Sequence, residues 1–143
     1  MAPAKGSLSA RGGNAPKVAV YIETGRQYLD GAVLIGDMDG VVRDRMRMAL
    51  NGHVVVTLIV DEQDEPLGEP WCEVMGLPQK GRSKADLVEV LEAELSQFVG
   101  RAERRTLRDD EKLEKELIRI VRQTSQAEIG KKPEVTVVVS RLA

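Results

Sequence analysis

With 143 residues, the chain is long enough for one domain with a sizeable core, and its 42% hydrophobic and 31% charged residues are typical of globular proteins. The net charge of −2 gives no general attraction to nucleic acid or to anionic membranes. The single cysteine, Cys72, excludes an internal disulfide and favours a cytoplasmic location. No apolar run approaches the length of a membrane span, so no membrane partner is expected.

The first 38 residues have the composition of a connecting segment. Residues 1–17 are rich in Ala, Gly, Pro, Ser and Asn, with three cations and no acid. Such a sequence buries too little surface to offset the entropy of ordering it. We therefore predict a disordered tail or linker at 1–17; the alternative is a basic arm that binds RNA. For residues 18–38 we predict an extended linker that includes a peripheral strand or connector.

The stretch VLIGDMDGVVRDR resembles the nucleophile loop of haloacid-dehalogenase-type phosphatases. In that chemistry Asp37 would attack phosphorus and Asp39 would handle the proton. The enzyme also needs a later acidic pair at a strand end, but Asp109 and Asp110 fall in the first turn of a predicted helix. We therefore interpret Asp39 as a helix N-cap and Asp37 as a turn residue.

Residues 39–143 are predicted to form a small domain that begins with a helix and a pair of strands. The apolar positions at 40–50 recur at helical spacing, and Asn51 with Gly52 ends the helix. The β-branched run at 53–60 predicts a strand buried on both faces. A polar turn follows, and residues 71–77 are expected to return as the antiparallel partner of that strand.

Two helices and a final strand complete the predicted order. A capping box at 83–86 opens the first helix, which Gly100 ends, and a second helix begins near Thr106 with Asp109 as its cap partner. The predicted buried residues are Val88, Leu91, Leu95, Phe98, Val99, Leu113, Leu117, Ile120, Val121 and Thr124. After Gly130, residues 134–142 form the last strand.

The resulting order is helix, strand, strand, helix, helix, strand. The last strand has to join the first two to bury its valines. This predicts an α+β fold, an α/β sandwich in which a three-stranded mixed sheet carries two helices packed on one face.

Candidate binding residues are cations and valines, and no catalytic residue can be assigned. His53 is the only histidine and Cys72 the only cysteine, so a zinc set is missing and we expect no metal or cofactor in this chain. The cations are candidate RNA phosphate contacts, or else a solvated connection or an interface with an acidic partner: Arg101, Arg104, Arg105, Arg108, Lys131 and Lys132. Val135, Val137 and Val139 are candidates for the core or for self-association.

From Gly25 onward the chain resembles the C-terminal part of bacterial ribonuclease J. The resemblance is carried by GRQYLDG, by IGDMDGVVRDRMRMALNGHVVVTLIVD and by the ending GKKPEVTVVVSRL. In that metallo-β-lactamase/β-CASP family such a segment follows the catalytic core. The resemblance implies a non-catalytic domain that supports dimerisation or tetramerisation of an RNA-processing and RNA-degrading enzyme, whose core would hold zinc or manganese. The expected partners are further copies of the chain, that catalytic core and RNA.

The same order of elements also suits a KH-like RNA-binding module, which is the alternative. KH domains clamp nucleotides with a Gly-x-x-Gly loop between paired helices. Here the corresponding segment is Gly100-Arg101-Ala102-Glu103, with an acid in place of the second glycine. This departure weakens the KH-like interpretation.

Overall fold

The computed structural model of the protein describes residues 26–36 and 40–142. The chain divides into two compact units, residues 1–46 and residues 47–143, and the boundary falls inside helix α3 (Gly40–Asn51). Each unit is described by itself. The predicted tail at 1–17 and the two aspartates of the phosphatase-like loop, Asp37 and Asp39, lie outside the described residues.

The described part of the first unit contains a β-hairpin. Strands β1 (Gln27–Asp30) and β2 (Val33–Gly36) pair antiparallel. Gly31 has a φ of 63° at the turn between them, a conformation that glycine adopts without steric cost. Asp30 also forms an ion pair with Arg45 of α3. The sequence predicted an extended segment here but not the pairing of two strands.

Helix α3 confirms the helix predicted at 40–50, and it ends at a glycine. The Gly52 amide donates a 2.8 Å hydrogen bond to the Met48 carbonyl, and the Gly52 φ is 75°. An ideal Cβ at Gly52 would lie 2.4 Å from Leu77 Cδ2, so glycine is required by conformation and by space.

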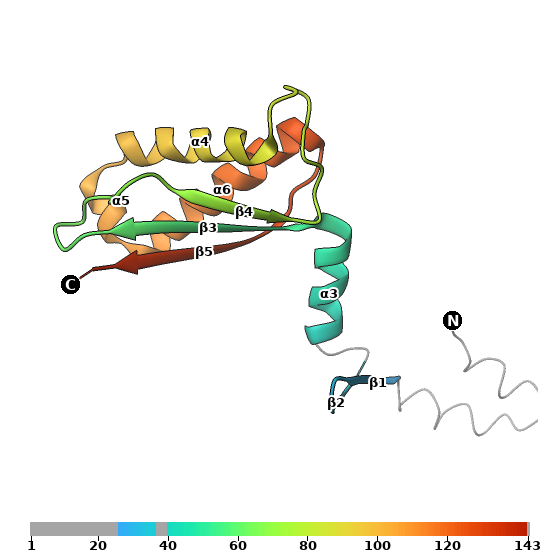
Figure 1. Ribbon diagram of the computed structural model, residues 1–143. Coiled ribbons are helices and arrows are strands. Elements are labelled where there is room, and N and C mark those ends of the chain that lie inside the picture. Colours follow the sequence, from blue (N-terminus) through green and yellow to red (C-terminus); the bar gives the residue numbers. More distant parts are fainter. Residues whose placement is uncertain (1–25, 37–39, 143) are drawn as a thin grey trace, which may run out of the picture. The chain divides into compact units, whose positions relative to one another are not determined.

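The second unit is built on a three-stranded mixed sheet in the order β4-β3-β5 (Figure 1). Strand β3 (His53–Val60) pairs antiparallel with β4 (Trp71–Met75) and parallel with β5 (Glu134–Arg141). The parallel register runs from His53 opposite Glu134 to Val60 opposite Arg141. This confirms the predicted fold class, including the antiparallel strand pair and the position of the last strand beside it.

Strand β3 is buried on one face only, so the prediction of burial on both faces was wrong. Val54, Val56, Leu58 and Val60 are buried, whereas the alternate residues are half-buried or exposed. The β-branched run is explained by the central position of β3 between two strands. Within the described residues of the second unit, α4 and α6 cover one side of the sheet (Figure 1).

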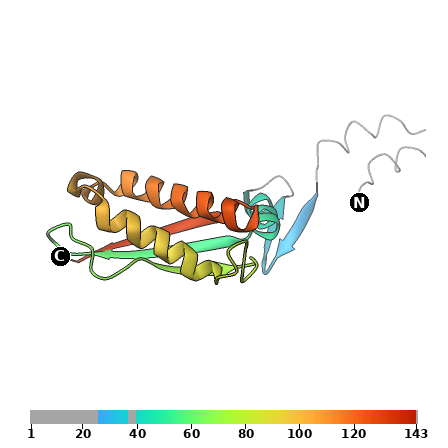
Figure 2. The same ribbon diagram turned by 90° about the horizontal axis from the view of Figure 1, so that it is seen from above.

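The helix layer consists of α4 (Leu87–Arg101), the short α5 (Arg104–Arg108) and α6 (Asp110–Ile129). Seen from above, α4 and α6 lie side by side over the strands (Figure 2). Their buried residues match the predicted stripes, except that Leu87 and Ser125 are fully buried while Val88 and Thr124 are half-buried. Together with the inner face of the sheet they form one hydrophobic core.

Both helix starts differ from the prediction. The Ser83 hydroxyl donates to Glu128 (2.6 Å) instead of capping α4, whose N-cap is Asp86 without a side-chain cap bond. Thr106 lies inside α5, and the Asp109 side chain caps α6 by accepting from the amides of Glu111 and Lys112. In each case a carboxylate provides the stronger acceptor, and it decides where the helix begins or which group the hydroxyl binds.

We expect Gly52→Ala to destabilise the second unit by about 2–4 kcal/mol, because it combines a left-handed φ with overlap against Leu77. Urea denaturation measures the change. Gly68→Ala is the matched control: its φ is 81° but nothing lies near the added Cβ, so it should cost only about 1 kcal/mol. Equal losses in both variants would show that the contact with Leu77 is unimportant.

Candidate functional site

A turn after β3 gathers acidic side chains at one end of the sheet. Asp61 Oδ1 accepts 2.9 Å hydrogen bonds from the amides of Gln63 and Glu65. This small Asx-type turn holds Asp64 at a φ of 63°. The carboxylates of Asp64 and Glu65 are thereby presented to the segment that joins α4 and α6.

Arg141, at the end of β5, joins three elements through its guanidinium group. It donates to Asp64 Oδ1 at 3.1 Å and to Asp110 Oδ1 at 2.8 Å, and its Nη2 donates to the Leu107 carbonyl at 2.6 Å. Its side chain is 28% exposed, so these charge-assisted bonds are partly shielded from water. Arg141 therefore fastens the turn and the α5–α6 junction to the last strand.

Three of the arginines predicted to contact RNA have acidic partners. Arg104 Nη2 lies 2.7 Å from Glu65 Oε1, Arg108 Nε lies 3.4 Å from Asp64 Oδ2, and Arg105 Nε lies 2.8 Å from Glu103 Oε2. The hydrogen bond to Glu65 also raises the pKa of Arg104. Because acidic side chains of the protein itself neutralise these arginines, the pairs favour the alternative of a solvated connection between the helices over RNA phosphate contacts.

The six predicted cations do not share one surface. Arg101 to Arg108 lie near the end of β5, where Arg141 binds the Leu107 carbonyl. Lys131 and Lys132 precede the start of β5, and Lys131 Nζ donates a 3.0 Å bond to the Leu50 carbonyl. An eight-residue strand separates the two groups, which corresponds to about 25 Å.

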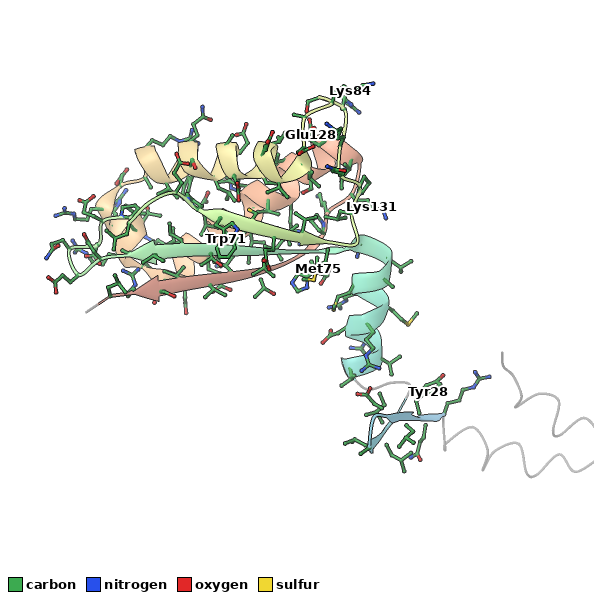
Figure 3. All side chains as sticks on the ribbon, in the orientation of Figure 1. Tyr28, Trp71, Met75, Lys84, Glu128 and Lys131 are labelled. Atoms are coloured by element: carbon green, nitrogen blue, oxygen red, sulfur yellow. The ribbon has the colours of Figure 1, made fainter. Side chains whose placement is uncertain are left out.

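The face of the sheet opposite the helices carries exposed apolar side chains. Strand alternation places Trp71 and Met75 on this face of β4, and Figure 3 labels both side chains. Across the ladder, Trp71 pairs with Thr57, and Thr57 pairs with Val138. Trp71 is 57% exposed and Val138 is 43% exposed, and Ile59 is also exposed. We call this surface of Ile59, Trp71, Met75 and Val138 the open sheet face.

The three valines predicted for core or interface point the other way. Val135, Val137 and Val139 are half-buried and pack against the core, whereas Thr136, Val138 and Ser140 alternate with them on the exposed side. The structure therefore places these three valines on the core side of β5, and Val138 is the exposed valine of that strand. The sequence could not show which face of β5 is exposed, because that depends on which side of the sheet the helices cover.

No group of three or more His, Cys, Asp or Glu side chains that could hold a metal occurs among residues 26–36 and 40–142. His53 shares a 2.8 Å hydrogen bond with Thr136 Oγ1. Cys72 is buried, and this burial, with a contribution from Glu92, raises the pKa of its thiol to about 12. Within the same residues, no helix is long and apolar enough to cross a membrane.

Sequence reasoning missed a row of cations on α6. Lys115, Arg119 and Arg122 recur every three or four residues and therefore lie on one face of the helix. With Lys132 they line a shallow hollow of about 410 Å³. The helical spacing was visible in the sequence, but the approach of Lys132 was not.

The comparisons with known proteins agree on one family. The sequence model of the ribonuclease J C-terminal domain matches residues 40–142. Ribonuclease J of Sinorhizobium meliloti (strain Sm2011 / Rm2011 / 2011) is 32% identical over 122 residues, which cover 82% of this chain and 21% of that protein. The chain thus spans about a fifth of the length of this relative.

We expect Arg141→Met to lower the free energy of unfolding by about 1–3 kcal/mol, because Asp64 Oδ1 and the Leu107 carbonyl lose the donors that Arg141 supplies. Arg105→Met is the control; its side chain is 76% exposed, and its loss should cost less than about 0.5 kcal/mol. Urea denaturation of both variants measures the difference. Indistinguishable midpoints would refute the structural role of Arg141.

We expect Cys72 to resist alkylation while the protein is folded. With a pKa of about 12, only about 10⁻⁴ of the thiol is ionised at pH 8, against about a quarter of an ordinary cysteine. Iodoacetamide labelling, followed by mass spectrometry, should therefore be at least about a hundredfold slower in native buffer than in about 8 M urea, where the protein is unfolded. Similar rates in the two conditions would contradict burial of the thiol.

Proposed function

Because this chain belongs to the ribonuclease J C-terminal domain family, we propose that it is the non-catalytic C-terminal module of a ribonuclease J-like enzyme of RNA processing and degradation in the bacterial cytoplasm. Its role is to support self-association of that enzyme, as a dimer or tetramer, and thereby its activity. The catalytic groups, with zinc or manganese, belong to the remaining part of the nuclease.

The observation that carries the self-association is the open sheet face. A tryptophan, a methionine, an isoleucine and a valine are exposed on the same side of the three strands. Tryptophan and methionine are enriched in the cores of protein interfaces, and clustered exposed apolar side chains mark interaction sites. The other face of the sheet is already covered by α4 and α6, so a partner has access only to this one.

A second copy of the same domain is the occupant that we propose. Two open sheet faces can pack as a sandwich about a twofold axis, with each copy presenting the same residues to the other. Trp71 would lose roughly 100 Å² of exposed area in such a contact, which is worth about 2.5 kcal/mol at 25 cal/mol per Å². A twofold dimer buries Trp71 of both copies, so this contribution to the association free energy occurs twice.

The edges of the sheet offer less than its face. The Cys72 amide at the β4 edge donates a 2.8 Å hydrogen bond to Glu92 of α4, so this edge is partly closed. At the β5 edge, the Arg141 side chain turns to the acidic residues of the neighbouring elements. Side-chain burial on the open face is therefore the larger contribution to association.

We expect Trp71→Glu combined with Val138→Glu to weaken self-association at least a hundredfold. The substitutions remove apolar contact area and add two carboxylates to a face that already carries Glu73, so that two copies would bring like charges together. Light scattering coupled to gel filtration over a concentration series measures the change. The wild-type chain should form dimers or larger species at micromolar concentrations.

Gln97→Glu with Gln126→Glu is the matched control because it also adds two acids, on the exposed sides of α4 and α6, and should leave association unchanged. A wild-type chain that stays monomeric at high concentration would reject the proposal. Equal weakening in this control would show that net charge and not the open sheet face controls association. Circular dichroism of each variant establishes that the domain is folded.

A further inference from the structure

The hollow beside α6 is lined mainly by cations. Its six lining residues are Lys115, Ile118, Arg119, Arg122, Gln123 and Lys132. Four of them are positively charged and none is acidic, although the chain as a whole has a net charge of −2. We call these four cations the α6 basic row. The local sign of the charge therefore differs from that of the whole chain.

The positions of the row are fixed by the fold. Lys115, Arg119 and Arg122 follow one another about one helical turn apart, so the three span about 10 Å along α6. Lys132 comes from the segment after the helix, where Gly130 adopts a φ of 69° and the chain turns back towards β5. Pro133 is fully buried, which holds the neighbouring Lys132 beside the helix. The row is thus a surface built from two segments.

Three of the four side chains of the row are available to a ligand. Arg119 also lines the hollow, but its guanidinium group donates to Glu116 (2.7 Å) and to the Gln123 side-chain oxygen (3.0 Å), so its charge is partly offset. Lys115, Arg122 and Lys132 have no acidic partner among the contacts of the described residues, in contrast to Arg104, Arg105 and Arg108. These cations lack an internal anion, so an external one can bind.

We propose that the α6 basic row binds the phosphate backbone of RNA, without regard to base sequence. The choice of RNA among polyanions rests on the proposed function. Arginine and lysine are the side chains that most often contact nucleic-acid phosphates. Base stacking requires exposed aromatic rings, and Trp71 lies on the opposite face of the sheet. Binding is therefore electrostatic, with a dissociation constant on the order of 10⁻⁴ to 10⁻⁵ M at physiological salt.

An acidic protein surface fits the row less well. Protein interfaces have a dry apolar core, and Ile118 is the single apolar residue that lines this hollow. The cations instead form a line along the helix, which suits a chain that carries one negative charge at every nucleotide. The open sheet face and the α6 basic row lie on opposite sides of the second unit, so one chain can use both.

The test is fluorescence anisotropy of the whole chain with a labelled single-stranded RNA of about 20 nucleotides, a length chosen to exceed the row, at two salt concentrations. With three phosphate contacts, affinity should fall about 20-fold between 50 and 200 mM KCl. The variant Arg122→Glu with Lys132→Glu should bind at least tenfold more weakly than the wild type and with a flatter salt dependence.

The matched control is Arg101→Glu with Arg105→Glu, which changes the charge equally near the far end of β5 and should weaken binding less than threefold. An equal loss in the control, or no binding by the wild type at 50 mM KCl, would overturn the proposal. So would a glutamate-rich peptide that displaces the RNA at the same charge concentration, because it would identify an acidic protein as the ligand.

Gel filtration of the row variants separates this proposal from the proposed function. They should elute as the wild type does, so that weaker RNA binding cannot come from lost self-association. In the opposite case, Trp71→Glu with Val138→Glu, titrated over the same concentration range as the wild type, should lose less than about threefold in affinity for RNA, as in the charge control. A larger loss of RNA affinity in that variant under those conditions would place the contact on the open sheet face and reject the α6 basic row.

Discussion

The burial of one face of β3 determines the organisation of the second unit. Val54, Val56, Leu58 and Val60 lie against α4 and α6, and β3 is hydrogen-bonded to a strand on each side. Because a strand alternates its side chains, the same packing that buries these four residues sends the other row to the opposite face. The open sheet face is thus a direct consequence of the core. No helix within the described residues of this unit covers it.

Charge is arranged differently at the two ends of the unit. Near the end of β5, the acids of the turn at 61–65 bind Arg104, Arg108 and Arg141, so the cations there serve the fold. Along α6, the acids stand mostly on other faces of the helix, and among the described residues only Glu116 forms an ion pair with a member of the basic row. The sequence alone does not distinguish these two groups of arginines and lysines. The structure does, because the first group has acidic partners and most of the second has none among the described residues.

Much of the fold followed from the sequence because its signals are local. Apolar spacing located α3, α4, α6, β3 and β5, the resemblance to ribonuclease J was confirmed by the comparisons, and the fold class was correct. The errors came from contacts between segments distant in sequence. Glu128 of α6 binds Ser83, which the local pattern assigned to a helix cap, and the helices leave one face of β3 open. The candidate surfaces depend on such contacts even more: Lys132 joins Arg122 only because Gly130 and Pro133 turn the chain back.

The parallel pairing of β3 with β5 also has a mechanical meaning. Tension that enters at His53 and leaves at Arg141 pulls the two neighbouring strands past each other, along their length, because both run in the same direction. The hydrogen bonds of the ladder, together with the bond from the Glu134 amide to the Gly52 carbonyl at its beginning, are then loaded at the same time and not opened one by one. The second unit can therefore carry a pulling force applied between these two points without peeling apart from one end.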